Sequence, residues 1–200
     1  MSLLTKSNFQ RIMLLLQGFS LILQFVLFKG NILNFFSYFT ILSNLLWGIA
    51  LWCSVFLNRT KAGDFLSGPG IVSAITLYLF IVGLVYNLVL RRTWDPQGWQ
   101  WLADNLLHVV NPFLIVCFWS FYIEKGTLKW KESLNWLWFP LIYLLYSLAR
   151  GHIVHWYPYP FLNVAVSGYL QVFINAGMVL ITFVLFGSLL LWLDRVLRKV

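Results

Sequence analysis

Charged residues are scarce in this chain of 200 residues, where they make up 10% of the total, and only six of them are acidic. Soluble domains carry about a quarter of their residues as charges. Hydrophobic residues make up 60% of the chain and aromatic residues 19%. The composition therefore excludes an ordinary soluble domain and indicates an integral membrane protein.

Cysteine and histidine are also scarce, with two and three residues. Cys53 and Cys117 fall inside apolar runs, so we interpret them as packing residues rather than as a disulfide framework or metal site. The chain lacks a basic stretch long enough to follow a nucleic-acid backbone, although its net charge is +8. We therefore predict no nucleic-acid partner and assign the basic residues to the ends of membrane spans.

Six apolar runs approach the length of about 20 residues that crosses a bilayer as a helix. The first run lacks a small-x-small cleavage site, so we interpret it as a retained span rather than a signal peptide. The connections are short, which favours one domain over residues 1–200. We predict an all-α bundle of six transmembrane helices, with the spans at 9–28, 36–57, 71–90, 103–122, 135–150 and 169–193.

The distribution of lysine and arginine orients this predicted bundle. Of the 14 basic residues, 10 fall on the side that holds both termini, and the last of these is Lys199. The other four, on the opposite side, are Lys29, Arg91, Arg92 and Arg150. Cytoplasmic loops carry the excess of positive charge, so we predict that both termini are cytoplasmic.

Polar side chains inside the runs gather in the half of the predicted bundle that faces away from the termini. Such groups are costly in a membrane and often mark a function. Thr40 and His108 each lie roughly 6–8 Å inside their helix starts, at about 1.5 Å per residue, so their depths match. We predict a polar chamber that opens to the outer leaflet or outer face and draws on Gln24, Thr40, Asn44, Tyr86, Asn87, His108, Asn111, Ser147, Arg150, Gln171 and Asn175.

Thr40 and His108 are the candidate catalytic pair in this chamber. A threonine hydroxyl is a weak nucleophile unless a base takes its proton, and a neutral histidine can do so. The oxyanion formed in such a reaction needs hydrogen-bond donors. The candidate donors are Asn44, Asn87, Asn111 and Asn175, and Arg150 is a candidate clamp for a substrate carboxylate or phosphate.

Structural interpretations remain open for the same residues. A threonine in a membrane helix commonly bonds its own i−4 carbonyl, and a histidine near the interface can be only a polar anchor. Arg150 fits snorkelling to the headgroups equally well, and Asn175 fits a bond between helices. Pro112 frees a backbone carbonyl near His108, which predicts a kink that shapes the site.

The connection 151–168 is rich in aromatic residues and contains Pro158 and Pro160, which forbid a regular helix. We predict that it forms an interfacial lid over the chamber, with Gly168 directly before the last span.

Three histidines and one aspartate support a second catalytic hypothesis. Asp104 and His108 are spaced i, i+4, so both can face one metal ion, and the lid adds His152 and His155. Such a ligand set suits a catalytic zinc that holds an activated water.

Three short motifs lie at the predicted chamber and lid. They read Tyr38-Phe39-Thr40-Ile41-x-Ser43-Asn44, His108-x-x-x-Pro112-Phe113 and Trp156-Tyr157-Pro158-Tyr159-Pro160-Phe161-Leu162. In order, approximate spacing and six-helix layout they resemble the androgen-induced-gene family of membrane proteins, and especially its bacterial six-span branch. The resemblance covers most of the chain, although Asn163 stands where the bacterial pattern often has an acidic residue.

Animal members of that family are intramembrane threonine hydrolases that cleave fatty acid esters of hydroxy fatty acids without a metal. The resemblance therefore implies that Thr40 is the nucleophile and His108 its catalytic partner, with no cofactor. It also implies a multi-pass protein of the bacterial cytoplasmic (inner) membrane.

The leading hypothesis from the sequence is an intramembrane lipid ester hydrolase. Its expected partners are a lipid or fatty acid ester substrate and the surrounding membrane lipids, with no obligate protein partner. The alternatives are a non-enzymatic lipid-binding or transport protein, whose chamber recognises an amphiphile, and the zinc hydrolase.

Overall fold

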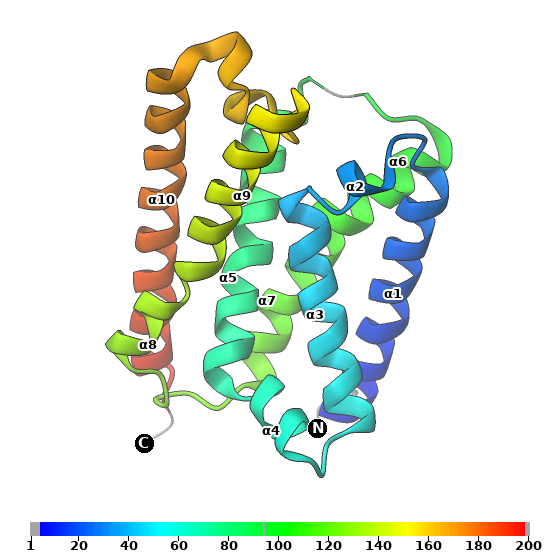
Figure 1. The fold of residues 1–200 in the computed structure, drawn as a ribbon. Helices are drawn as coiled ribbons and strands as arrows, with labels where there is room; N and C mark the ends of the chain where they lie inside the picture. Colours follow the sequence, from blue (N-terminus) through cyan, green and yellow to red (C-terminus); the bar gives the residue numbers. More distant parts are fainter. Residues whose placement is uncertain (1–4, 94, 199–200) are drawn as a thin grey trace.

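The computed structural model describes residues 5–93 and 95–198, so Lys199, counted above for orientation, lies outside the described residues. Every regular element in this part of the chain is helical. Six helices are long and apolar enough to cross a membrane (Figure 1): Lys6–Leu27, Phe39–Phe56, Pro69–Leu90, Gly98–Tyr122, Ser133–Val154 and Val164–Val196. The prediction of an all-α chain with six spans is confirmed at this level.

Several spans are built from more than one helical segment. The α-helices are α1 (Lys6–Leu27), α2 (Ile32–Phe35), α3 (Phe39–Phe56), α4 (Lys61–Leu66), α5 (Pro69–Val85), α6 (Gly98–Asn105), α7 (Asn111–Tyr122), α8 (Trp130–Asn135), α9 (Trp138–Val154) and α10 (Val164–Val196). The π-helical segments η1 (Tyr86–Leu90) and η2 (Leu106–Val110) continue α5 and join α6 to α7, and η3 (Pro160–Leu162) is a 3₁₀ turn.

Helical structure extends further into the last connection than the sequence predicted. α9 continues to Val154, and α10 begins at Val164, where the Asn163 side chain accepts a hydrogen bond from the Ala165 N–H at 3.1 Å. Such a cap satisfies one of the free N–H groups of a helix start. Gly168 lies inside α10 with φ 72° and ψ 162°. This conformation is not helical, and glycine adopts positive φ without strain. Gly168 therefore separates a short helical segment that begins at Val164 from the long part of α10, which starts directly after Gly168 as the sequence predicted.

The disturbance predicted at Pro112 takes the form of the π-helical segment η2. Proline lacks the N–H that would bond the His108 carbonyl in a regular helix, and π-helical turns often occur at functional sites. A Cβ atom on Gly83 of α5 would lie 3.1 Å from the His108 carbonyl oxygen and 3.2 Å from the Pro112 Cβ. The glycine thus lets α5 approach the segment that carries His108.

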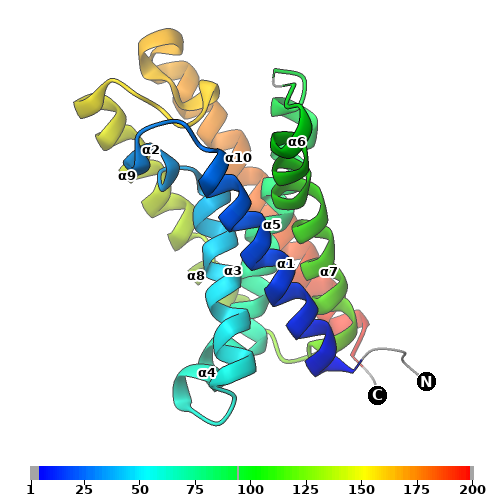
Figure 2. The same ribbon diagram turned by 90° about the vertical axis from the view of Figure 1, so that its right-hand side faces the viewer.

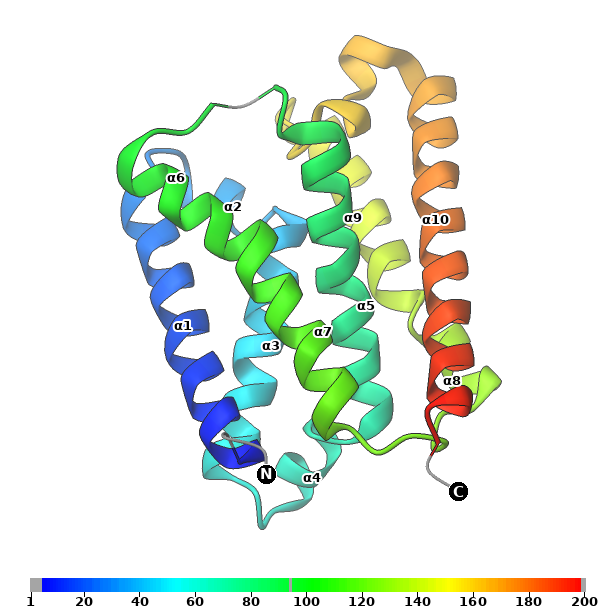
Figure 3. The same cartoon turned by 180° about the vertical axis from the view of Figure 1, so that it is seen from behind.

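The helices form a bundle with α5 at its centre. α5 packs against α3, α7 and α10, and α1 packs against α3 and α7. From behind, α7 runs obliquely between α1 and α5 (Figure 3). α9 and α10 stand together on one side of this group (Figure 1), and the view turned by 90° shows α9 leaning away from α6 (Figure 2). α1 begins and α10 ends at the same end of the bundle (Figure 1); we call the opposite end the site end.

A polar contact fastens the loop before α8 to the end of α10. The Gly126 and Leu128 N–H groups donate to the carbonyl and carboxylate oxygens of Asp194, at 2.9 and 3.1 Å. In the same loop, the Lys125 ammonium bonds the carbonyls of Trp119 and Ile123 and lies 3.9 Å from the centre of a Trp119 ring. Burial lowers the pKa of Lys125 from 10.5 to about 8, although the Asp194 charge raises it in part.

We expect the stability of the detergent-purified protein to depend on this lysine above pH 8. The folded pKa of Lys125 lies below the unfolded value, so the charged amine disfavours folding below pH 8. That penalty disappears between pH 8 and about 10.5. Between pH 8 and about 10.5, the melting temperature of the wild type should therefore rise with pH relative to that of Lys125→Met. A melting temperature that changes with pH in the same way in both proteins from pH 7 to 10.5 would contradict the lowered pKa of Lys125.

Candidate active site

Thr40 is the second residue of α3, at the site end, and its side chain is 7% exposed. Tyr38 precedes α3 in an extended conformation, and the Tyr143 hydroxyl of α9 holds the Ser37 carbonyl at 2.8 Å. Because residue 36 lies outside α3, Thr40 has no preceding helical turn whose carbonyl its hydroxyl could bond. The Thr40 hydroxyl also lies where unpaired N–H groups give a helix start a positive partial charge, which favours a developing negative charge.

The His108 ring faces Thr40 from η2. Its Nε2 lies 3.3 Å from Thr40 Oγ1, within reach of a hydrogen bond. Its Nδ1 lies 2.9 Å from the Asp104 carbonyl oxygen and 3.3 Å from the Asp104 Oδ1. Both of these oxygens accept hydrogen bonds, so the proton belongs on Nδ1 and the Nε2 lone pair faces the Thr40 hydroxyl. This is the tautomer in which His108 can act as a base.

Asp104 supports His108 from one helical turn earlier. Its side chain is 7% exposed, and its Oδ2 accepts a hydrogen bond from the Tyr86 hydroxyl. The Tyr86 ring stacks on the His108 ring, with centres 4.1 Å apart and planes 18° from parallel. Thr40, His108 and Asp104 thus form a hydroxyl–imidazole–carboxylate series with the order of groups found in catalytic triads. The sequence analysis predicted Asp104 only as a metal ligand. Its four-residue spacing from His108 also fits a carboxylate that bonds the histidine ring.

Tyr159 lies in the lid, the segment 155–163 that remains between α9 and α10, and it contacts Thr40. Its hydroxyl oxygen accepts the Thr40 N–H at 3.2 Å and lies 3.3 Å from Thr40 Oγ1. Burial raises the pKa of Tyr159 to about 12, although its bonds to Thr40 lower it in part. The hydroxyl therefore stays protonated at neutral pH and can donate a hydrogen bond. The sequence predicted a lid but did not single out this residue, because nothing in an irregular segment shows which side chain points inward.

Asn44 and Asn111 lie behind Thr40 rather than beside its hydroxyl. Asn44 Nδ2 donates to the Thr40 carbonyl at 2.8 Å, and its Oδ1 accepts from Gln17 at 3.0 Å and from Asn111 at 3.2 Å. Asn111 also donates to the Ser20 hydroxyl at 2.9 Å. This network ties α1, α3 and α7 together and fixes the backbone that carries Thr40.

We expect Asn44→Ala to lower the free energy of unfolding by about 2–4 kcal/mol, because it leaves buried partners of the amide unpaired. The melting temperature in detergent should fall by roughly 5–15 °C. Asn87→Ala is the matched control, since Asn87 is exposed. An equal effect of the two substitutions would contradict this role for the network.

The other three predicted binding residues are also placed away from Thr40. Asn87 bonds the Gly83 carbonyl and Arg91 on the exposed side of the α5–η1 span, at 2.8 Å each. The Asn175 amide donates to the Phe161 carbonyl at 2.9 Å and so fastens the lid to α10. Arg150 donates to Asn34 Oδ1 at 2.6 Å and lies 5.2 Å from a Trp156 ring centre. The donors beside Thr40 Oγ1 are instead the Tyr159 hydroxyl and the Thr40 N–H.

The ligand set of the zinc hypothesis is not brought together. His152 and His155 are exposed, and neither lines the cavities at His108. Within residues 5–93 and 95–198, no group of three or more His, Cys, Asp or Glu side chains is placed to hold a metal ion.

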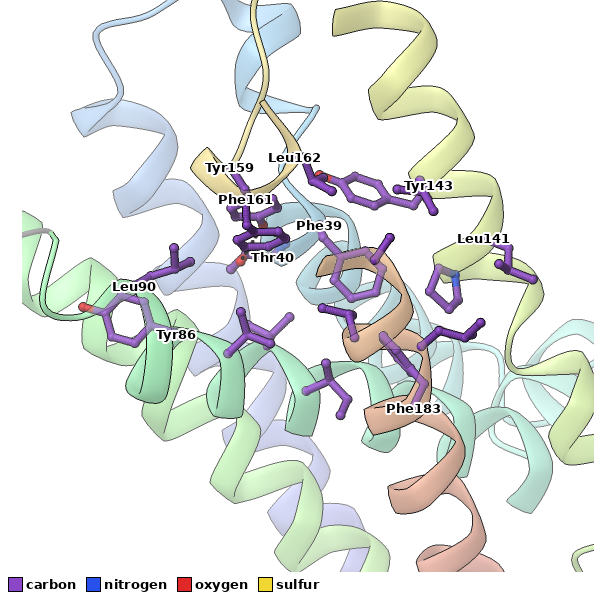
Figure 4. Close-up of a pocket in the computed structure, with 18 of the residues that line it drawn as sticks. Phe39, Thr40, Tyr86, Leu90, Leu141, Tyr143, Tyr159, Phe161, Leu162 and Phe183 are labelled. Atoms are coloured by element: carbon purple, nitrogen blue, oxygen red, sulfur yellow. Dashed lines mark hydrogen bonds between the residues drawn. The ribbon is translucent and has the colours of Figure 1, made fainter. Parts of the chain in front are cut away.

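Two cavities meet at Thr40. The first lies between α5, α9 and α10, has a volume of about 100 Å³, is partly open to the outside, and is lined almost entirely by apolar groups. Figure 4 shows Thr40, Tyr159 and Phe161 on one side of it and Leu141 and Phe183 on the other. The second, the outer cavity, is larger and more polar. The residues common to both are Thr40, Tyr86, Leu90, His108 and Tyr159.

No family model, curated protein or solved structure matches this chain.

Proposed function

We propose that this protein is an intramembrane hydrolase of lipid esters, with Thr40 as the nucleophile and His108 as the general base. The observation that carries the proposal is the 3.3 Å contact between Thr40 Oγ1 and His108 Nε2, in the tautomer that accepts a proton. The resemblance to the androgen-induced-gene family supports the same pair and points to fatty acid esters of hydroxy fatty acids.

In the first half of the reaction, Thr40 Oγ1 attacks the ester carbonyl carbon while its proton passes to His108 Nε2. Asp104 stabilises the resulting imidazolium at Nδ1. The carbonyl oxygen becomes an oxyanion, and the Thr40 N–H and the Tyr159 O–H are the donors positioned beside it. The carbon–oxygen bond to the alcohol then breaks, His108 returns the proton to the leaving oxygen, and the acyl group remains on Thr40.

In the second half, a water molecule attacks the acyl–Thr40 ester. His108 takes a proton from this water, and the same two donors hold the second oxyanion. Collapse of the intermediate breaks the bond between the acyl carbon and Thr40 Oγ1, and His108 returns the proton to this oxygen. The products are a carboxylic acid and the free enzyme, so the cycle uses only groups of this chain and one water.

The topology predicted from charge indicates on which side of the membrane the site lies. With both termini in the cytoplasm, the site end, and with it Thr40, faces the outer half of a bacterial inner membrane. The cavity residues on α9 and α10 are largely half-buried, so this cavity reaches the lipid-facing surface. A lipid ester could enter there without crossing water.

The experiment that tests the proposal is labelling of the detergent-purified protein with a fluorophosphonate probe, followed by intact mass measurement. We expect one adduct on the wild type and none on Thr40→Ala or His108→Ala. Thr76→Ala is the control, because Thr76 is a buried hydroxyl that bonds its own helix at the Val72 carbonyl; its adduct should persist. An adduct that survives in Thr40→Ala would overturn the proposed nucleophile.

The same apolar cavity also fits a lipid-binding protein without enzymatic activity. The two functions differ at Thr40, since binding of a lipid does not need an activated hydroxyl. Saturable lipid binding that survives in Thr40→Ala, together with no labelling of the wild type, would favour the binding protein.

A further inference from the structure

The two cavities that meet at Thr40 are both mostly apolar, but the outer cavity contains more polar groups. The cavity between α5, α9 and α10 presents hydrocarbon side chains, and the Tyr143 hydroxyl at its wall already donates to the Ser37 carbonyl. The outer cavity is lined by Lys29, Thr93 and Asp104, and by Gln24, which accepts a hydrogen bond from Gln100 at 2.9 Å. A polar substituent would lose its hydrogen bonds in the first cavity and keep them in the second.

An ester has two arms, one on each side of its carbonyl carbon. When that carbon is placed at Thr40 Oγ1, one arm can extend into each cavity, because Thr40 and His108 line both. The acyl arm of a simple lipid ester is pure hydrocarbon, whereas the alcohol arm carries any polar groups. The chemistry of the two walls therefore favours one orientation of the substrate.

The apolar cavity follows one face of α10. Ala176, Val179, Leu180 and Phe183 line it at helical spacings of three and four residues. This stripe spans roughly 10 Å along the helix axis at about 1.5 Å per residue. Phe183 is 2% exposed and contacts the rings of Phe39 and Tyr78, with centres 6.1 and 6.3 Å away. These packed rings close the end of the cavity at this residue.

We propose that this cavity, the acyl cavity, binds the unbranched acyl chain of the substrate, and that Ala176 and Phe183 set the chain length it accepts. The outer cavity takes the alcohol arm. This assignment rests on the proposed function. It further specifies the orientation of the substrate and the length of its acyl chain. The stripe length favours chains near the size of an octanoyl group over acetyl or palmitoyl groups.

The test fills the acyl cavity beside Ala176. Purified wild type, Ala176→Phe and Met178→Phe are assayed with the acetyl, octanoyl and palmitoyl esters of 4-nitrophenol. Met178 is 55% exposed on the same helix, so Met178→Phe is a matched change outside the cavity. We expect the wild type and Met178→Phe to prefer the octanoyl ester over the acetyl ester at least tenfold in kcat/KM. Ala176→Phe should lose most of this preference while its activity on the acetyl ester is retained.

A binding measurement separates this inference from the proposed function. An octanoic acid analogue with a mid-chain diazirine is photolysed with each protein and with Thr40→Ala, and the adducts are mapped by mass spectrometry. We expect adducts on the α9 and α10 segments that line the acyl cavity in the wild type, Met178→Phe and Thr40→Ala, but not in Ala176→Phe. Val179→Phe provides a second block should Ala176→Phe fail to fold.

Each outcome bears on one of the two claims. Thr40-dependent hydrolysis with an unchanged chain preference in Ala176→Phe would overturn the acyl-cavity assignment and leave the hydrolase intact. Absence of Thr40-dependent hydrolysis would overturn the function, and the photolabel would then decide the cavity alone. Loss of the adducts only in the cavity-filling variants supports a chain site, and adducts that remain in them overturn it.

Discussion

Thr40→Ala and His108→Ala are each expected to lower kcat for a lipid ester by at least about 10³-fold, and by up to about 10⁶-fold. Each variant removes one partner of a single proton transfer, so the remaining partner has nothing to act on. The double variant should therefore be no slower than either single variant. Rates are measured on the octanoyl ester of 4-nitrophenol in detergent, with melting temperatures recorded in parallel to show that the variants are folded.

A graded series gives this prediction its control. Thr40→Ser keeps a hydroxyl at the same position, so it should retain most of the activity. Asp104→Asn should lower kcat by a smaller factor, about 10²-fold. In a catalytic triad where the acid side chain alone sets the histidine tautomer, the same change lowers kcat by about 10⁴-fold. The expected loss is smaller here because the Asp104 backbone carbonyl, 2.9 Å from His108 Nδ1, is unchanged by the substitution and still holds the proton there. Additive losses in the double variant would mean that Thr40 and His108 act independently.

Hydrophobic pattern and charge were enough to predict the spans and the shared depth of Thr40 and His108. Run lengths near 20 residues specify membrane helices almost without regard to tertiary contacts. Their boundaries were less predictable because caps decide them. The Asn163 side chain starts α10 at Val164, five residues before the predicted start, and the Gly168 kink follows inside it.

The direction of polar side chains could not be predicted from spacing. The sequence predicted Asn44 as an oxyanion donor, but its side-chain amide donates to the Thr40 carbonyl and accepts a hydrogen bond from Gln17. A buried amide must satisfy both its donor and its acceptor. The donor bonds a carbonyl of its own helix, and the partners of the acceptor come from α1 and α7. Such partners depend on how the helices pack, which a single sequence does not show.

Tyr159 illustrates the remaining limit. It lies 119 residues from Thr40 in the sequence, in a segment whose prolines exclude any regular periodicity. Its position depends on ring contacts with Tyr38 and Phe161, at 5.7 and 5.2 Å between centres, and on the bond from Asn175 to the Phe161 carbonyl. A sequence pattern can mark such a segment as a lid but cannot say which ring enters the site.

Tyr159→Phe is expected to lower kcat by about 10²–10³-fold, which is the usual cost of removing one oxyanion donor. In the structure the Tyr159 hydroxyl accepts the Thr40 N–H and lies 3.3 Å from Thr40 Oγ1. Once the carbonyl oxygen carries charge, both this N–H and the tyrosine O–H can turn to it. Because the bond strengthens as charge develops, KM should change much less than kcat.

The matched control for this prediction is Tyr146→Phe. Its hydroxyl also bonds a residue near the start of α3, the Ser37 side chain at 2.8 Å, but it lies outside both cavities. We expect Tyr146→Phe to keep kcat within about threefold of the wild type, since it removes a similar bond without touching the reacting atoms. A Tyr159→Phe variant that loses affinity for the ester while its kcat is unchanged would place the hydroxyl in substrate binding instead. Equal losses in the two variants would mean that tyrosine hydroxyls at the site end act only by holding the lid and α9 in place.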